Sequence, residues 1–147
     1  MPERLTSAAR RAVTQAQAEA LALGAPTIEA EHLLLALAAG GDDGAAALAT
    51  YGLTHDRLLE LLEQEHQRSL VHAGVDVPAS ALGRTLPRRK PRLGTSTKAV
   101  LVRAVGGATR HRGISSLDLL RATVRAEAGT VPRVLAIAGV SPEDLAA

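Results

Sequence analysis

The fold of this chain is decided by a stretch that occurs twice. Residues 27–34 read TIEAEHLL and residues 113–120 read GISSLDLL, so a polar start leads into a pair of leucines in both. Two further blocks return in the same order: residues 11–13 (RAV) as 98–100 (KAV), and residues 52–58 (GLTHDRL) as 139–145 (GVSPEDL). The offset between the copies is 86 to 87 residues. A repeat of this length predicts two similar half-domains that share one core.

Each copy is predicted to contain four helices, because apolar residues recur at three- and four-residue spacing. In the first copy the expected helices cover about residues 8–23, 28–39 after a Thr27 cap, 44–50, and 55 onward. In the second they cover about residues 96–109, 116–126 after a Ser115–Asp118 capping box, 132–138, and a truncated segment after Ser141. We therefore predict an all-α fold, with two pseudo-repeated four-helix units forming one eight-helix bundle.

Length and composition fit one domain. The 147 residues are 46% hydrophobic, with one Tyr and no Phe or Trp, so the core must be built from Ala, Leu and Val, which suit closely packed helices. We expect a single domain over residues 1–147, with repeat one at 5–69 and repeat two at 93–147. Between them, residues 70–92 form a basic Pro- and Gly-rich linker in which prolines exclude a continuous helix.

The charge is unevenly distributed. Residues 1–69 carry ten acidic and five basic side chains, net −5, whereas residues 70–147 carry twelve basic and five acidic ones, net +7. Two interpretations stay open: the halves attract each other within one domain, or the second half binds an anionic partner. The basic run at residues 88–92 likewise fits either a solvated linker or a phosphate-binding segment.

Motifs for catalysis, metals and cofactors are absent from the sequence. There is no phosphate-binding Gly-rich loop, no His-Glu-x-x-His and no cysteine, and Glu63 with His66 is a single weak pair of possible metal ligands. We therefore predict a protein that is not an enzyme and has no metal and no cofactor. The lack of cysteine fits a cytoplasmic location, and no apolar run approaches the ~20 residues of a membrane span.

Several motifs together resemble the N-terminal domain of the Clp unfoldase ATPases, most closely the ClpC type. They are Glu3-Arg4-Leu5-Thr6, Ala9 to Val13, Gln15 to Gln17, and Ile28 to Leu37 with its Glu31-His32-Leu33-Leu34 centre. The resemblance is strong in repeat one and weak in repeat two, and it implies two four-helix repeats. Since no ATPase module accompanies them, it also implies a stand-alone member.

In that family the domain is a binding module that receives substrate or adaptor proteins for a Clp ATPase. ClpC-type domains also recognise phosphorylated arginine, which implies Glu31 as the guanidinium partner and Thr6 or Ser7 on the phosphate side. The alternative role of Glu31 is to stabilise the first turn of its helix. In repeat two Leu117 stands in the place of Glu31, so the resemblance implies that the second site is lost.

A second family surface binds cyclic peptides between the first helices of the two repeats. The residues that match it are Arg10, Val13, Gln17 and Lys98, whereas two aromatic positions are replaced by Pro2 and Leu93. Fewer aromatic anchors predict weaker binding of such ligands. Val13 fits core packing equally well.

The function predicted from the sequence is a non-catalytic peptide- or protein-binding module of the Clp kind. It would recognise phosphoarginine or sequester cyclic peptides, with substrate or adaptor proteins and a Clp ATPase as partners and no membrane. The alternative is a regulatory protein that binds nucleic acid or another polyanion through the basic linker and the second repeat. Nucleic acid is the less favoured of these two anionic partners, because no aromatic side chains lie among the basic residues to stack on nucleobases.

Overall fold

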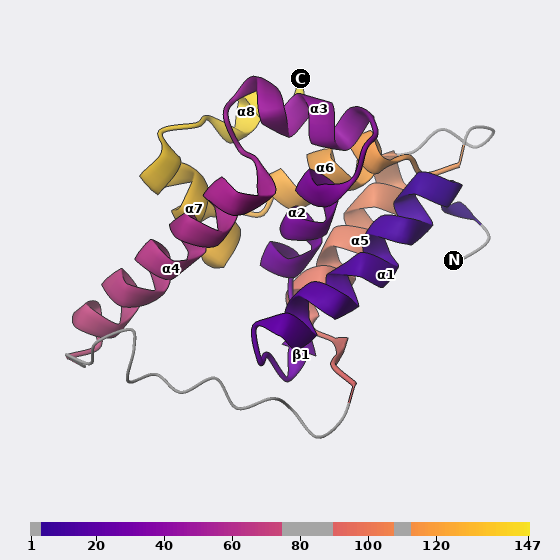
Figure 1. Cartoon of the computed structure of the whole chain (residues 1–147). Coiled ribbons are helices and arrows are strands. Elements are labelled where there is room, and N and C mark those ends of the chain that lie inside the picture. The colour runs from indigo at the N-terminus through magenta and orange to yellow at the C-terminus, as the bar shows by residue number, and fades with distance from the viewer. Residues whose placement is uncertain (1–3, 75–89, 108–112) are drawn as a thin grey trace.

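A computed structural model of the chain describes residues 4–74, 90–107 and 113–147 (Figure 1). Within these residues lie eight helices and two short strands. Their order is α1 (Ser7–Ala22), β1 (Thr27–Ile28), α2 (Ala30–Ala39), α3 (Asp43–Thr50), α4 (His55–His72), β2 (Arg92–Leu93), α5 (Thr95–Gly107), α6 (Ser116–Val124), α7 (Thr130–Ala138) and α8 (Pro142–Ala146). The all-α prediction and the four-helix plan of each copy are confirmed. Residues 75–89 of the predicted linker lie outside the described residues.

The core is shared by both copies and centres on α2. Leu33, Leu34, Leu35 and Leu37 are all buried, and α2 packs against helices of both halves, namely α1, α3, α4, α5, α6 and α7. The matching helix of the second copy, α6, contributes Leu119 and Leu120 to the same cluster. Along α1 four of the five buried side chains are alanines, the fifth being Glu19, and the alanines let the backbones of α1 and α2 approach closely.

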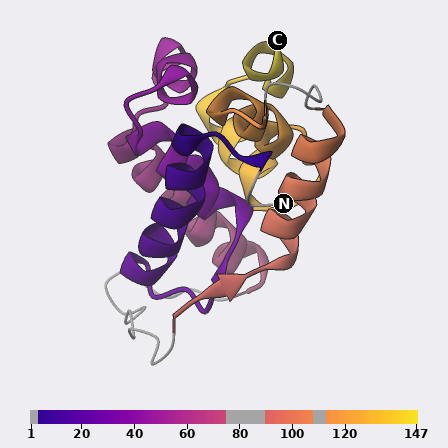
Figure 2. The same cartoon turned by 90° about the vertical axis from the view of Figure 1, so that its right-hand side faces the viewer.

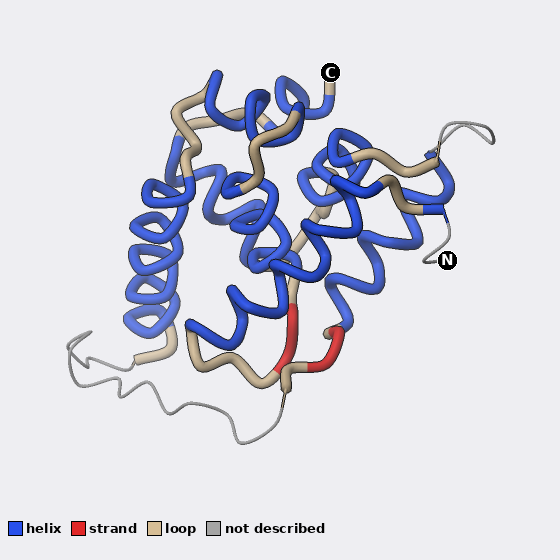
Figure 3. Tube along the Cα trace, turned by 45° about the vertical axis from the view of Figure 1, so that its right-hand side comes forward, coloured by secondary structure: helices blue, strands red, loops and turns tan. Residues whose placement is uncertain are grey.

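The two copies exchange the segments that precede their first helices. β2, at the start of the second copy, pairs in parallel with β1 of the first, so Thr27 faces Arg92 and Ile28 faces Leu93 (Figure 3). Reciprocally, Leu5 of the first copy bridges in parallel to Ile114 of the second. The short extended segment before α1 thus lies against the one before α6, and the segment before α5 lies against the one before α2.

The hydrogen bonds of this exchange give the true register of the repeat. The Thr6 N–H donates to the Ile114 carbonyl at 3.0 Å, and the Gly94 N–H donates to the Ile28 carbonyl at 2.9 Å. Thr6 therefore corresponds to Gly94, an offset of 88 residues. The buried positions agree: Ala9, Ala12 and Ala16 on α1 match Thr97, Val100 and Ala104 on α5. The sequence comparison matched Arg11 with Lys98, because both precede an Ala-Val pair. The buried positions show that this register is wrong by one residue, and Lys98 corresponds to Arg10.

One predicted helix cap was also wrong. Thr27 does not cap α2, because it is part of β1, and Glu29 holds the N-cap position instead. The capping box predicted for the second copy is confirmed: the Ser115 N–H donates to Asp118 Oδ2 at 2.9 Å, and the Asp118 N–H donates to Ser115 Oγ at 3.1 Å.

Across the described residues, every helix taken alone is too short or too polar to cross a membrane; α2 and α3 together would pass by length and composition, but a bend of 97° separates them.

Candidate functional site

The candidate site begins at the first turn of α2. Glu29 is the N-cap residue, and Glu31 and His32 follow within the first turn. The Glu29 N–H donates to His32 Nδ1 at 2.9 Å, and the His32 side chain is buried. Because Nδ1 accepts this bond, the neutral ring carries its proton on Nε2. This bond holds the first turn of α2 in place, and in this turn the Glu31 side chain is partly exposed.

The start of α5 lies directly against the start of α2. The Ser96 hydroxyl accepts the Ala30 N–H at 2.8 Å and donates to Glu29 Oε1 at 3.2 Å. The Thr97 hydroxyl donates to the Ile28 carbonyl at 2.6 Å. An N-terminal amide of α2 is thus satisfied by a serine from the other copy, in the way that a capping side chain would satisfy it.

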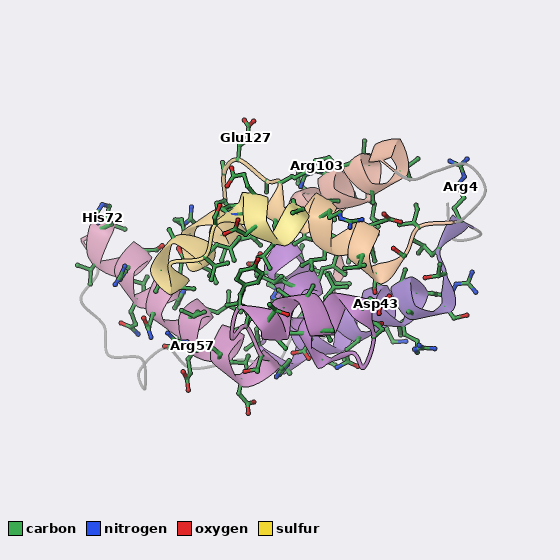
Figure 4. The ribbon with its side chains drawn as sticks, turned by 90° about the horizontal axis from the view of Figure 1, so that it is seen from above. Arg4, Asp43, Arg57, His72, Arg103 and Glu127 are labelled. Atoms are coloured by element: carbon green, nitrogen blue, oxygen red, sulfur yellow. The ribbon has the colours of Figure 1, made fainter. Side chains whose placement is uncertain are left out.

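A groove of about 380 Å³ opens beside this contact, between the start of α2, one side of α5 and the loop before α7. We call it the Glu31 groove. Its charged and hydroxyl-bearing side chains are Glu29, Glu31, Ser96, Arg103, Glu127 and Thr130. Three carboxylates stand against one guanidinium, so the lining is acidic overall. Figure 4 shows Arg103 and Glu127 along the same edge of the molecule.

Arg103 is the cation of the groove, and its position is fixed. Its Nε donates to the Ala122 carbonyl near the end of α6 at 3.0 Å. A guanidinium has five N–H donors in a planar fork, so this bond orients the group and leaves its terminal nitrogens to other partners.

Glu31 is the carboxylate whose charge is least compensated. Burial raises the pKa of Glu31 above its ordinary value, and the nearby charges of Glu29 and Glu65 raise this pKa further. A hydrogen bond to its own backbone and the more distant Arg133 act in the opposite direction. Among the described residues no cation forms an ion pair with Glu31. Arg133 is paired with Glu65 instead, with 2.7 Å between Arg133 Nε and Glu65 Oε1. A cation in the groove would therefore favour the ionised form of Glu31.

The loop before α7 adds a helix start to the groove. Gly129 is the N-cap of α7 with φ of +106°, a conformation that glycine adopts without strain. Having no side chain, it makes no capping hydrogen bond. The first amides of α7, beside Thr130, thus carry the partial positive charge of a helix N-terminus into the groove wall.

A family model described as the Clp repeat (R) N-terminal domain matches residues 4–110, which is most of the chain. The chain belongs to this Clp family. Among solved structures it is similar to the N-terminal domain of the caseinolytic protease associated chaperone ClpD from Arabidopsis thaliana. The TM-score is 0.70 at 24% identity, and the match covers 98% of this chain and 90% of that one. No curated protein sequence matches this chain.

Thr6 and Ser7 of this Clp N-domain lie far along the fold from Glu31. The Thr6 hydroxyl caps α1, accepting an N–H within the first turn at 3.2 Å. Ser7 lines a hollow between the start of α1 and residues 36–42 at the end of α2. Because α1 and α2 run antiparallel, the start of α1 lies at the opposite end of α2 from Glu31 (Figure 1). The structure therefore does not bring Thr6 and Ser7 to Glu31, whose charged neighbours are Glu29, Glu65 and Arg133 and whose groove is also lined by α5.

The residues predicted for a peptide groove lie along α1 and around the start of α5, the two helices that flank the view in Figure 2. Gln17 reaches across to this second segment, where its Nε2 donates to the Pro91 carbonyl at 3.5 Å, close to the partly exposed Leu93. Lys98 is exposed in the first turns of α5. Gln17, Leu93 and Lys98 thus belong to one region.

The remaining two residues of that predicted groove have other neighbours. Arg10 lines the hollow beside the end of α2. Val13 is partly buried and packs against the core, as the core-packing alternative expects.

In the second copy, Leu117 takes the place of Glu31 in the first turn of the matching helix α6. Leu117 packs against the core and offers no charge to a ligand. Glu63 and His66 were only a weak pair of possible metal ligands, and no metal was predicted for them; in the parts of the chain that the structure describes, no three His, Asp or Glu residues gather to hold a metal ion.

Four residues of the Glu31 groove were missed by the sequence reasoning: Ser96, Arg103, Glu127 and Thr130. All four belong to the second copy, whereas the predicted partners of Glu31 were sought within the first. The signal that could have found them is the Arg-Leu pair before each first helix, at residues 4–5 and 92–93. The pair does not show which segment each copy pairs with, because that depends on the exchange of strands between the two copies.

Proposed function

We propose that this Clp N-domain is a non-catalytic binding module that receives segments of substrate or adaptor proteins through the Glu31 groove. The observation that carries the proposal is the uncompensated carboxylate of Glu31 in an acidic groove. A partly buried carboxylate without a cation is costly, and a charge-assisted bond to a ligand recovers that cost. The ligand group that fits best is a guanidinium, whose planar fork matches a carboxylate.

Phosphoarginine is the ligand that we propose for the groove. It carries a negative phosphoryl group on the guanidinium itself, so it needs a carboxylate and a cationic partner close together. Glu31 would receive the guanidinium, and Arg103 with the first amides of α7 would receive the phosphoryl oxygens. Helix N-termini and arginine are both favourable partners for such oxygens. The hydroxyl of Thr130 would take the phosphate-side role predicted for Thr6 and Ser7, whereas the Ser96 hydroxyl already donates to Glu29 and holds that carboxylate in place.

Calorimetric titration with free phosphoarginine tests this proposal. We expect one-site binding to the wild-type protein and at least a tenfold loss of affinity in Glu31→Gln, which keeps the shape but removes the charge. Glu60→Gln is the matched control, because Glu60 is an exposed carboxylate on α4 that pairs with Arg57. Its affinity should stay within about twofold of wild type.

Two results would overturn the proposal: no heat of binding with wild-type protein, or equal affinities for wild type and Glu31→Gln. Unphosphorylated arginine in parallel separates the roles of the two groups, since it keeps the contact to Glu31 and loses those to Arg103. The binding of cyclic peptides along α1 and α5, a Clp ATPase as partner, and a cytoplasmic location all stay predictions.

A further inference from the structure

A second hollow, of about 290 Å³, lies between the later part of α5, the outer side of α6 and the end of α8. Three arginines line it, Arg103 from α5 and Arg121 and Arg125 from α6. We call it the arginine pocket. It shares Arg103 with the Glu31 groove, and the other residues that line the two hollows are different.

The charge of the arginine pocket is not balanced by its own residues. Asp118 is the one carboxylate side chain among its described lining residues. One oxygen of Asp118 already accepts the Ser115 N–H at 2.9 Å, and the other stands 3.8 Å from the Arg121 guanidinium. Three guanidinium groups therefore stand against the Asp118 carboxylate and the terminal carboxyl group of Ala147, which also lines the pocket, so a positive surplus remains. Arg121 and Arg125 are also four residues apart on one helix, a spacing at which like charges repel.

The repeat shows that the fold does not require these arginines. With the offsets of 88 residues for α5 and 86 residues for α6, their counterparts in the first copy are Gln15, Leu35 and Ala39. None of these is charged, and Leu35 is fully buried in the core. Arg103, Arg121 and Arg125 thus have uncharged counterparts in the first copy, and all three line one hollow in the second.

We propose that the arginine pocket is a binding site for a phosphate dianion, free or carried on a peptide side chain. A phosphate monoester carries a charge of about −1.5 to −2 at neutral pH, which is opposite in sign to the surplus of the pocket. Arginine forks bind phosphate oxygens in pairs, and the small side chains of Ala104, Ala122 and Ala146 leave room between them. The volume accommodates a phosphoryl group with the side chain that carries it, and is at the lower limit for larger ligands.

The test is a titration of the whole chain with inorganic phosphate at low salt, followed by amide NMR. We expect saturable shifts at residues of α5 and α6, and an affinity at least about tenfold weaker in the double variant Arg121→Gln/Arg125→Gln. The matched control is Arg57→Gln/Arg68→Gln, which changes the net charge equally. Both of its residues are exposed on α4, and Figure 4 shows Arg57 on the opposite side of the molecule from Arg103.

A second readout is thermal stability. Phosphate should raise the Tm of the wild type and of the control, and leave the Tm of Arg121→Gln/Arg125→Gln unchanged, because a ligand stabilises only the state that binds it. A short phosphoserine peptide and its unphosphorylated form show whether the pocket accepts the group on a side chain. Binding of inorganic phosphate alone assigns the site to free phosphate.

Equal losses of affinity in the two double variants would overturn the proposal, as they would indicate non-specific attraction to net charge. So would the absence of saturable shifts in the wild type. The result is independent of the Glu31 groove: Arg121→Gln/Arg125→Gln should keep its affinity for phosphoarginine, so one proposal can fail without the other.

Discussion

The side chain of Glu29 occupies the space in which a side chain at residue 94 would have to stand. A Cβ built on Gly94 would overlap the Glu29 carboxylate group. The Gly94 N–H also donates to the carbonyl of Ile28, the residue before Glu29. A side chain at residue 94 would therefore force the flexible Glu29 carboxylate away from Ser96, whose hydroxyl donates to it.

We expect Gly94→Ala to lower the free energy of unfolding by about 1–3 kcal/mol, the usual cost of forcing extra atoms into a packed site. Chemical denaturation with urea measures this difference. The substitution should also weaken ligand binding in the Glu31 groove, because Glu29 must move.

Gly106→Ala, near the end of α5, is the matched control. Nothing lies within 4 Å of a Cβ at this position, and alanine favours a helix over glycine by about 0.5–1 kcal/mol. The control should therefore be stabilising. A Gly94→Ala protein as stable as Gly106→Ala would contradict the described contact.

His32 makes the stability depend on pH. Burial lowers the pKa of His32 below its ordinary value of 6.5, although the charge of Glu19 acts against this. The folded state therefore binds fewer protons than the unfolded state between the lowered pKa and 6.5. Stability is fully present above pH 6.5 and is lost as the pH falls through this window, by at most about 1.4 kcal/mol per pH unit.

Thermal melts of wild type and His32→Asn at several pH values measure this dependence. Asn can still accept the Glu29 N–H, so the variant should fold and show a smaller loss of Tm below pH 6.5. His72→Asn, at the exposed end of α4, should behave like the wild type. An identical acid dependence in wild type and His32→Asn would show that other groups cause it.

Glu31 is expected to lower stability at neutral pH. Its pKa is raised by burial, so the folded state holds the proton more tightly than the unfolded state. The stability that this proton confers is present at acidic pH and is lost as the pH rises above 4.5 through the raised pKa. Glu31→Gln should therefore melt on the order of 2 °C above the wild type at pH 7.

The difference between Glu31→Gln and wild type should shrink towards pH 4, where the wild-type carboxyl is protonated. Differential scanning calorimetry across this range checks the sign. A variant less stable than wild type at pH 7 would mean that Glu31 acts chiefly as a helix-stabilising residue.

The ion pair between Glu65 and Arg133 joins α4 to α7. The Glu65 side chain is 8% exposed and also accepts the Ser69 hydroxyl, whereas Arg133 is 55% exposed. Arg133→Gln leaves a buried carboxylate without its cation, which should cost about 1–2 kcal/mol after allowance for the exposure of Arg133. Arg57→Gln breaks the exposed pair with Glu60 and should cost less than about 0.5 kcal/mol. Equal costs, measured by urea denaturation, would mean that the burial of Glu65 has no consequence.

The helices could be predicted from the sequence because their signals are local. Apolar spacing, the Ser115–Asp118 capping box and the Pro142 start are each contained in a few residues, and each corresponds to a helix in the structure. The repeat could be read as well, although its register over α1 and α5 was wrong by one residue. Buried positions decide that register, and burial is a property of the fold.

The site could be predicted only in part, since its parts are far apart in the sequence. Glu31 stands out through its motif, but Ser96 lies 66 residues from the amide of Ala30 that it caps. The two-residue strands that bring them together are too short to leave a periodic pattern. The resemblance implied Thr6 and Ser7 as partners of Glu31, but the antiparallel packing of α1 on α2 separates them from it.

The exchanged strands also bear on how such a domain can evolve after duplication. The Glu31 groove takes Glu29 and Glu31 from one copy and its hydroxyl-bearing and basic side chains, together with Glu127, from the other. The same exchange relates the start of α1 to Leu117. An ancestor with identical copies would have carried two equivalent grooves, each a composite of both. A single replacement at residue 117 could then silence one groove and leave the other intact, and the helix surfaces of the silenced half became free to acquire a different specificity.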